Sequence, residues 1–264
     1  MKARTVKLMK IRFLWISAIA VCVAITRVFC AVPNSGKLQA CISEEELRNR
    51  IAAATKGFQD LTMVGTVVYK NRKALAKIES AYSMLYDFKS AGISFKYPDK
   101  LRMEGKLGMV RFEYIVNGST KIIRAPSVRI NKKEDYSDDP AKTQGALDIG
   151  LVTPSLWQKR KVELVDDPEA AANGELKLRL RWPKGDMIYH IWIDAQDLYL
   201  KMFEKRDAQG RLQIKVVYSD PKRFGGVIWM PTRVEVFGPD GEKAGVSELS
   251  DVKVNTGLPD SLFE

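Results

Sequence analysis

The chain has 264 residues, of which 45% are hydrophobic and 28% are charged, and its formal net charge is +11 at pH 7. This hydrophobic content is enough to build a core, which excludes a disordered chain, and the charged content excludes a polytopic membrane protein. The length fits one large β domain or two small ones.

The first thirty residues form a basic and then apolar leader. Five Lys and Arg residues precede the apolar run Phe13–Ile25, and Arg27 follows it. A spanning helix needs about 20 apolar residues, so this shorter run predicts a secretory signal peptide over 1–30 and an exported protein. Two alternatives stay open. The leader is an uncleaved signal anchor that tethers the protein to a membrane, or Cys30 is lipidated, which Phe29 disfavours because a small residue usually precedes a lipidated cysteine.

The leader also changes what the charge implies. It holds six basic residues and no acidic one, so its removal lowers the net charge from +11 to +5. No long Lys/Arg run with interleaved aromatic residues remains, and we expect no nucleic-acid partner. Because Cys22 and Cys30 fall in the leader, Cys41 is a lone thiol that builds neither a disulfide framework nor a zinc site. We therefore expect no metal and no cofactor.

A linker and one helix follow the leader. Residues 31–42 contain Pro33 and Gly36 and predict the linker. Ser43 with Glu46 three positions later is a capping box, and it predicts a helix over 43–57. The apolar stripe of this helix repeats at helical spacing: Leu47, Ile51, Ala54 and Phe58.

Strand patterns dominate the rest of the chain and fall into two groups. The first group predicts strands over 61–71, 75–89, 92–97, 101–105, 109–116, 121–125 and 127–136, with a hairpin turn at 117–118. The second group predicts strands over 161–165, 176–182, 187–194, 198–206, 211–219, 227–237 and 243–254. Tight turns between consecutive strands predict an antiparallel meander. Residues 137–160 separate the groups and predict short helices or an ordered lid.

Many of these strands carry one apolar face. The stretch GELKLRLRW alternates basic residues with four apolar ones: Leu176, Leu178, Leu180 and Trp182. A sheet must bury such a face against another layer, and the predicted helices are too few to cover it. Three arrangements remain open: a sandwich, a packed barrel, or a cup that curls around the helix and leaves an apolar cavity.

No catalytic pattern accompanies these strands. His190 is the single histidine and lies inside a strand pattern, so it has no partner for a metal site or a triad. Asp194 and Asp197 fit turn chemistry better than acid–base catalysis. No Gly-x-Ser-x-Gly elbow and no Cys–His arrangement is present, and we therefore expect a protein that is not an enzyme.

Three segments resemble a known family. They are FKYPDKLRMEG (residues 95–105), IWIDAQDLYLKMFEKRDAQG (191–210), and GGVIWMPTRVEV (225–236) with the ending VKVNTGLPDSLF (252–263). Together they resemble the periplasmic outer-membrane lipoprotein carriers of the LolA type, within the broader lipoprotein-sorting family. The resemblance extends over most of residues 43–263.

The resemblance implies a fold and a function. The fold is mainly β with few helices, a curved antiparallel sheet that forms an incomplete β-barrel with a helical lid, here over residues 43–264. The cavity binds acyl chains of lipoproteins, or another lipid, and the carrier is a monomer that moves them from an inner-membrane donor to an outer-membrane acceptor. The rival function on the same fold is an envelope regulator or sensor. Such regulators usually carry a second C-terminal domain, and the final strand motif lies close to Glu264, which favours the carrier.

The same resemblance suggests where cargo binds. We expect apolar side chains from the helix, the strands and the 137–160 region to line the cavity: Leu47, Ile51, Phe58, Leu101, Met103, Phe112, Trp157, Leu178, Leu180, Ile214 and Trp229. In the carriers an arginine that gates the lid precedes the proline of the first segment. Tyr97 holds that position here, before Pro98, and Arg102 lies nearby, so these three are the gating candidates.

Overall fold

The computed structural model describes residues 42–78 and 80–264. The predicted signal peptide, the linker up to residue 41, and the fates of Cys30 and Cys41 therefore lie outside the described residues. Within the described part of the chain, none of the helices combines the length and the apolar character that crossing a bilayer requires.

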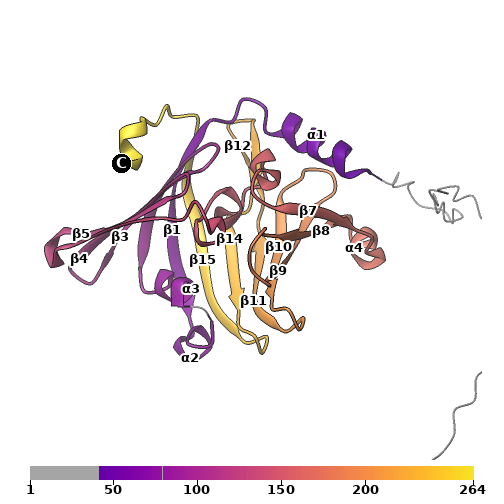
Figure 1. Cartoon of the computed structure of the whole chain (residues 1–264). Helices are drawn as coiled ribbons and strands as arrows, with labels where there is room; N and C mark the ends of the chain where they lie inside the picture. Colours follow the sequence, from indigo (N-terminus) through magenta and orange to yellow (C-terminus); the bar gives the residue numbers. More distant parts are fainter. Residues whose placement is uncertain (1–41, 79) are drawn as a thin grey trace, which may run out of the picture. The chain divides into compact units, whose positions relative to one another are not determined.

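The described residues form one large antiparallel sheet of thirteen strands, ordered β6-β5-β4-β3-β2-β1-β15-β14-β11-β10-β9-β8-β7. Figure 1 shows that the sheet is strongly curved, and its edge strands β6 and β7 do not pair with each other, so it is an open barrel. The predicted mainly β fold with an incomplete barrel is confirmed. The bounds are β1 Asp60–Lys70, β2 Ser90–Lys96, β3 Lys100–Leu107, β4 Val110–Asn117, β5 Thr120–Ala125, β6 Ile130–Asp135, β7 Lys161–Val165, β8 Glu175–Arg181, β9 Ile188–Asp194, β10 Leu200–Arg206, β11 Leu212–Ser219, β14 Arg233–Phe237 and β15 Lys243–Val254.

Side-chain alternation explains which face of each strand is buried. In β11, Ile214, Val216 and Tyr218 are buried while the intervening residues are half-buried. Adjacent residues of a strand point to opposite faces, so these three side chains share the concave face of the sheet. In β8, Leu178 and Leu180 are buried in the same cluster as the β11 residues.

The prediction of one continuous strand over 227–237 is wrong, because this region contains two strands. The structure divides it into β13 (Ile228–Met230) and β14, with Pro231 between them. Proline has no N–H for a strand ladder, which explains the break. β13 pairs instead with β12 (Lys222–Phe224) in a separate two-stranded hairpin.

The strand predicted over 75–89 is also wrong. Two short helices occupy this region, α2 (Arg72–Leu75) and α3 (Ser80–Leu85). The Asn71 side chain accepts hydrogen bonds from the backbone N–H groups of the second and third residues of α2, at 3.1 and 3.3 Å, which caps the helix. Ala74, Leu75 and Ile78 are buried in the main core cluster, a spacing that suits one helical face.

Residues 136–160 connect the two edge strands β6 and β7. They contain the short helices η2 (Pro140–Lys142), η3 (Ala146–Ile149) and η4 (Pro154–Trp157), as the sequence predicts for 137–160. Ala146 and Ile149 pack in a cluster with strands β1 to β3, whereas Leu147 and Leu156 pack in the larger cluster with strands β7 to β11. The connection thus runs inside the curve of the sheet and helps to fill it (Figure 1).

The predicted N-terminal helix is α1 (Glu44–Ala54). Ser43 caps it by accepting a hydrogen bond of 3.1 Å from the backbone N–H of Glu46. Leu47 and Ile51 are buried in the main cluster, and Arg50 Nη2 donates 2.7 Å to the carbonyl of Ala195 in the β9–β10 turn. In Figure 1, α1 and the α2–α3 pair lie at opposite ends of the sheet. Three further short helices complete the described part: η1 Pro126–Val128, α4 Pro168–Ala172 and η5 Asp260–Phe263.

The C-terminal segment packs on the other face of the sheet. Phe263 of η5 is fully buried against Ile115 of β4 and Ile122 of β5. Val116, the neighbour of Ile115, belongs to the concave cluster instead, so η5 covers the convex face. Figure 1 shows the chain end beside β3 to β5.

Candidate functional site

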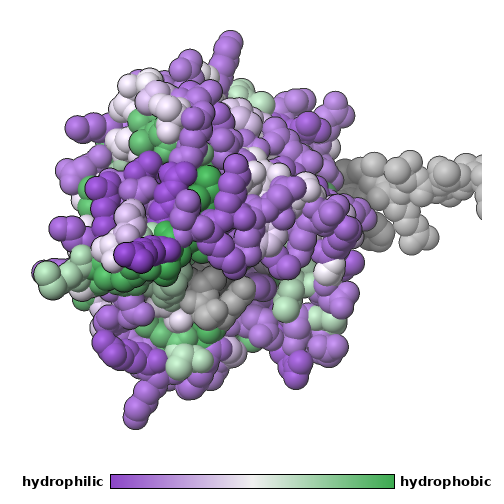
Figure 2. Space-filling model, turned by 60° about the vertical axis from the view of Figure 1, so that its left-hand side comes forward, coloured by the Kyte–Doolittle hydropathy of each residue, from purple (hydrophilic) through white to green (hydrophobic). Residues whose placement is uncertain are grey.

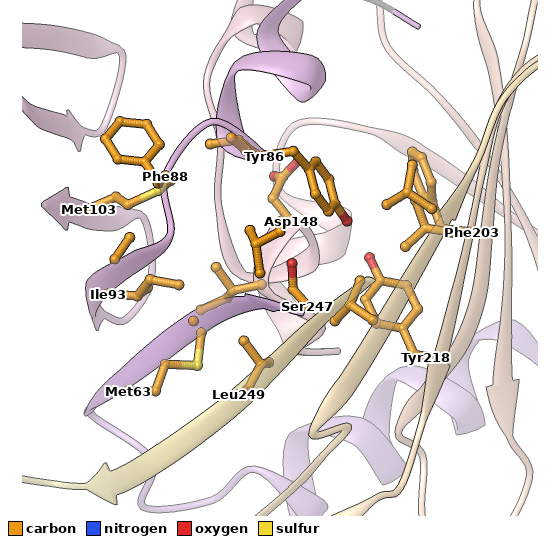
Figure 3. A pocket seen from close by; sticks show the side chains of 18 of the residues that line it. Met63, Tyr86, Phe88, Ile93, Met103, Asp148, Phe203, Tyr218, Ser247 and Leu249 are labelled. Atoms are coloured by element: carbon orange, nitrogen blue, oxygen red, sulfur yellow. The ribbon is translucent and has the colours of Figure 1, made fainter. Parts of the chain in front are cut away.

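An apolar cavity of about 170 Å³ lies on the concave side of the sheet. Figure 3 shows side chains from several strands and from residues 86–88 converging on it. Strands β1, β2, β3, β10, β11, β14 and β15 supply most of the lining, the 136–160 connection closes one side, and the end of α3 and the turn after it close another. The lining is Met63, Gly65, Val67, Leu85, Tyr86, Phe88, Ala91, Ile93, Met103, Leu147, Asp148, Ile149, Phe203, Val216, Tyr218, Val234, Val236, Ser247 and Leu249.

Two aromatic side chains dock the segment after α3 onto the sheet. The Tyr86 ring lies directly over Gly245 of β15, and the Phe88 ring lies over Gly105 of β3, where a β-carbon would come within 2.6 Å of the ring. Only a residue without a side chain leaves room for such rings. Phe88 also meets Phe112 edge-on, with ring centroids 6.3 Å apart. We call residues 72–88, which contain α2 and α3, the lid segment.

The outer end of the lid segment is held by polar contacts. Lys77 forms ion pairs with Asp240 and Glu242 in the β14–β15 turn, the second at 3.3 Å, and Asn71 donates 2.8 Å to Glu242. These groups are solvent-exposed, where single ion pairs stabilise by about 0–1 kcal/mol. The lid segment is therefore attached by side-chain docking and weak surface contacts, without strand pairing.

Large apolar side chains are exposed around the lid segment. Val68 and Tyr69 end β1, and Met84 and Leu85 end α3; their exposed fractions are 49%, 45%, 43% and 37%. Figure 2 shows a mostly hydrophilic face on which hydrophobic residues gather in one area. Grouped apolar exposure of this kind is typical of binding surfaces.

A few polar groups face the otherwise apolar cavity. Tyr86 makes a side-chain hydrogen bond with Ser247, and burial raises the pKa of this tyrosine to about 12 although that hydrogen bond opposes the shift. Burial also raises the pKa of Tyr218, with a further contribution from the negative charge of Asp148. Both phenols are therefore neutral at physiological pH. Figure 3 shows Tyr86, Asp148, Tyr218 and Ser247 around the same space.

A smaller, more polar cavity of about 80 Å³ adjoins the first. The two share Leu147, Asp148 and Phe203 in their linings. The polar cavity is lined otherwise by residues of the 136–160 connection and of strands β8 to β10: Ala141, Thr143, Gln144, Arg160, Leu180, Trp182, Tyr189 and Lys205. Asp148 lines both spaces. Many protein atoms surround it, but its side chain keeps accessible surface because it faces the two cavities. The concave side of the sheet thus holds an apolar chamber and a polar chamber side by side, with Leu147, Asp148 and Phe203 in the wall between them.

Burial and mutual attraction act in opposite directions on the two charges of the polar chamber. Burial raises the pKa of Asp148, while the Gly145 N–H, at 2.8 Å, and the positive charge of Arg160 favour the carboxylate. Burial lowers the pKa of Arg160, which the charge of Asp148 partly offsets. An arginine remains a cation under any such shift, so Arg160 is a half-buried positive charge.

The structure brings one of the eleven expected lining residues, Met103, to the apolar chamber. Leu180 lines the polar chamber. Leu47, Ile51, Leu178 and Ile214 are buried in the main core cluster. The remaining five lie in neither chamber: Phe58 and Leu101 in the second cluster, Phe112 against Phe88, Trp157 with Nε1 donating 3.1 Å to Glu44, and Trp229 beside Tyr199. Contact of these side chains with cargo stays a prediction.

The three gating candidates are separated. Pro98 lines a recess of about 40 Å³ that shares Arg160 and Trp182 with the polar chamber, and Tyr97 packs at the second cluster. Arg102 points to the convex side, where it donates 3.0 Å to the carbonyl of Leu262 and pairs with Glu104 and Glu113 at 3.1 and 3.3 Å. Arg102 therefore holds the C-terminal segment in the described structure.

Sequence reasoning missed the lid residues and the interior charges. Tyr86 and Phe88 fell in a predicted strand, and Asp148 and Arg160 lay in the irregular 137–160 region. Gly105 and Gly245, inside strand patterns, were a usable signal, since a glycine in a strand often marks a close approach. In the described residues no group of three His, Cys, Asp or Glu side chains is placed to hold a metal ion.

Comparisons with known proteins bear on the fold alone. No family model matches the chain, and no curated protein matches it. A putative outer membrane lipoprotein-sorting protein domain from Vibrio parahaemolyticus is similar in structure, with a TM-score of 0.59 at 12% identity over 83% of this chain and 94% of that one. A LolA superfamily protein from Nitrosomonas europaea gives a TM-score of 0.50 at 15% identity, over 83% of this chain and 94% of that one. The chain has the fold of these lipoprotein-sorting and LolA-superfamily proteins, as the three sequence segments predicted.

Proposed function

We propose, from this fold and the cavity it encloses, that the protein is a periplasmic carrier for the acyl chains of lipoproteins or of another lipid, and not an enzyme. The observation that carries the proposal is the apolar chamber on the concave side, closed by a lid segment that has no strand partner. The carrier receives cargo from an inner-membrane donor and passes it to an outer-membrane acceptor, working as a monomer that the leader exports.

The size of the chamber indicates how cargo enters. About 170 Å³ is close to the roughly 150 Å³ apolar cavity that holds one benzene molecule, and below the 300–1,000 Å³ of typical ligand pockets. A long acyl chain therefore does not fit while the lid segment is docked. Displacing Tyr86 and Phe88 from their glycine recesses enlarges the chamber and widens its opening to the surface.

Reversible docking suits a carrier for an energetic reason. Each buried CH₂ contributes roughly 0.8 kcal/mol, so one long acyl chain contributes on the order of 10 kcal/mol and leaves a rigid pocket slowly. The lid segment is attached by side-chain contacts, namely the two aromatic rings, the core residues Ala74, Leu75 and Ile78, and surface ion pairs. Cargo or a partner can displace it without breaking a strand ladder. Met63 and Met103 in the lining adapt to different chains because methionine has three flexible bonds.

The test adds a side chain at the wall of the apolar chamber and leaves the lid segment unaltered. Gly65 of β1 faces the chamber and would accept a β-carbon at ordinary contact distances of 3.5 Å or more. Gly92 of β2, which pairs with Val64 of β1, faces the convex side. There it would accept a β-carbon 3.6 Å from the Glu104 side chain. Gly65→Val should weaken binding of a fluorescent fatty acyl probe at least about tenfold, while Gly92→Val should bind as the unaltered protein does.

Mass spectrometry of the protein purified from envelope extracts provides the second measurement. Acylated species that co-purify with the unaltered protein and are lost in Gly65→Val support the carrier. A stoichiometric protein partner without lipid, together with no uptake of the probe, overturns the proposal and favours the envelope regulator on the same fold. N-terminal sequencing of that material tests export, since a cleaved leader removes residues 1–30.

A further inference from the structure

The polar chamber is lined by Arg160, whose guanidinium has N–H donors that no described acceptor uses. The Arg160 guanidinium lies 4.2 Å from the centre of the Trp182 ring, a cation–π contact that fixes its plane. Within the described residues this arginine has no carboxylate or carbonyl acceptor; its attraction to Asp148 is through space. A planar guanidinium held in this way presents paired N–H donors, the geometry that binds phosphate or carboxylate with two hydrogen bonds.

Neighbouring polar groups already have partners and do not compete for Arg160. Gln144 accepts a hydrogen bond from Tyr114, and Thr143 Oγ1 donates 2.9 Å to the carbonyl of Pro140. Arg160 is half-buried, lines the cavity and has no acceptor among the described side chains, so it is placed to meet an acidic group that arrives with a ligand. The recess at Pro98 also has Arg160 in its lining, which gives a polar head a route to solvent.

Asp148, in the wall shared by the two chambers, is a hydrogen-bond acceptor, whereas Arg160 is a donor. Asp148 accepts one hydrogen bond from its own turn, from Gly145 N–H at 2.8 Å, and otherwise faces the two spaces. A carboxylate accepts several hydrogen bonds, so Asp148 has capacity for a hydroxyl or ammonium donor. The donor and the acidic group recognised by Arg160 must belong to one head, since the polar chamber is only about 80 Å³.

We propose that the two chambers together bind an amphiphile whose head combines an acidic group with a hydroxyl or ammonium donor. Arg160 holds the acidic group, Asp148 accepts from the donor, and the hydrocarbon tail enters the apolar chamber past Leu147 and Phe203. The inference rests on the proposed function and adds the class of head: a phospholipid-type head in preference to a neutral acyl glyceride.

Three amphiphiles with ten-carbon tails test the proposal on the full protein by isothermal titration calorimetry. They are decanoyl lysophosphatidylethanolamine, with phosphate and ammonium, decyl phosphate, with phosphate only, and decanoylglycerol, with a neutral head. The unaltered protein should bind them in that order. Arg160→Gln should weaken binding of both phosphates about 10- to 100-fold, the range of a charge-assisted hydrogen bond, and leave decanoylglycerol unchanged.

Further variants separate head recognition from damage to the fold. Arg160→Lys keeps the charge and should retain the order of the two phosphates over decanoylglycerol, and Asp148→Asn should reduce lysophosphatidylethanolamine to the level of decyl phosphate. Arg181→Gln, at the exposed end of β8, is the matched control and should bind all three normally. Equal losses for all three ligands in Arg160→Gln, or no loss for any, overturn the inference. Equal affinities in the unaltered protein overturn the head preference while the carrier stands, whereas no binding of any ligand overturns the carrier itself.

Discussion

The ring of Tyr86 occupies the space in which a β-carbon of residue 245 would lie. Tyr86 follows α3, and Gly245 belongs to β15 in the middle of the sheet, so this contact joins the lid segment to the strand farthest from it in sequence. The absence of a side chain at 245 is thus a condition for the lid to close. A prediction about opening follows from it.

Gly245→Ala should release the lid segment. The added methyl group and the Tyr86 ring cannot share the site, and such overpacking costs typically 1–3 kcal/mol, which favours undocking of the ring. We expect faster proteolytic cleavage within residues 72–88 and faster uptake of a fluorescent acyl probe. Gly92→Ala, whose β-carbon has room at 3.6 Å, is the control and should change neither rate. Unchanged cleavage in Gly245→Ala would show that Tyr86 does not hold the lid.

Asp60 should make the protein sensitive to acid. Its buried carboxylate accepts hydrogen bonds from Thr256 N and Oγ1, Gly257 N and Leu258 N at 2.6 to 3.2 Å. Burial raises the pKa of Asp60, but these four bonds together outweigh it, and the net pKa is lowered. The stabilisation is present above the unfolded pKa of about 3.9 and is lost as the pH falls through the lower folded pKa.

Asp60→Asn measures this contribution by urea unfolding. At neutral pH the amide cannot accept all four bonds, and we expect a loss of about 1–3 kcal/mol in the free energy of unfolding. The difference between the variant and the unaltered protein should shrink below about pH 4, where the carboxylate of the unfolded chain takes up a proton before the native one does. A constant difference over the whole pH range would contradict this assignment.

Phe263 should anchor the C-terminal segment to the convex face. Its side chain is fully buried against Ile115 and Ile122, and Arg102 and Arg124 donate to the carbonyls of Leu262 and Glu264 at 3.0 and 2.7 Å. Phe263→Ala should lower the free energy of unfolding by about 3–5 kcal/mol, as for other buried aromatic residues.

Phe263→Leu is the matched variant for this site and should lose much less, because most of the apolar volume is kept. Both variants should bind acyl probe normally while folded, since the segment lies on the face opposite the chambers. A binding defect in folded Phe263→Ala would contradict the separation of the two faces.

His190 should titrate below its ordinary range. Burial lowers its pKa, and Lys177 and Arg179 add repulsion of the charged form; Arg179 Nε lies 3.5 Å from His190 Nε2. Because the chain has one histidine, a single NMR titration reports it, with an expected midpoint below about 6.5. The unfolded chain binds the proton first, so stability should fall as the pH drops from about 6.5 through the folded pKa, and His190→Gln should remove this dependence.

Local patterns predicted most of the sheet because alternation acts over a few residues. Leu178 and Leu180 in β8 and Ile214, Val216 and Tyr218 in β11 are buried as their two-residue spacing implies. The Ser43 cap and the short helices of 137–160 likewise follow from local signals. Pro231 lies inside the strand predicted over 227–237, and its missing N–H explains why the structure has two strands there.

The chambers could not be predicted in the same way because distant segments build them. Tyr86, Asp148 and Gly245 are far apart in sequence and meet through the curvature of the sheet. Apolar residues such as Leu47 and Leu178 were expected at a cavity, but they fill the core, and hydrophobicity alone does not distinguish the two roles. Asp148 and Arg160 lay in a region without periodicity, where a pattern gives no side-chain direction.

The pairing of β1 with β15 has a consequence for how the protein folds. Strands β1 to β6 and β7 to β11 are meanders whose neighbours follow one another along the chain, so each half can zip up locally. The seam between the halves forms only when residues 243–254 are available to pair with β1, and such distant pairings slow folding. A nascent chain therefore stays without its closing strand until residues 243–254 have been synthesised, which is compatible with the proposed export of the protein before it folds.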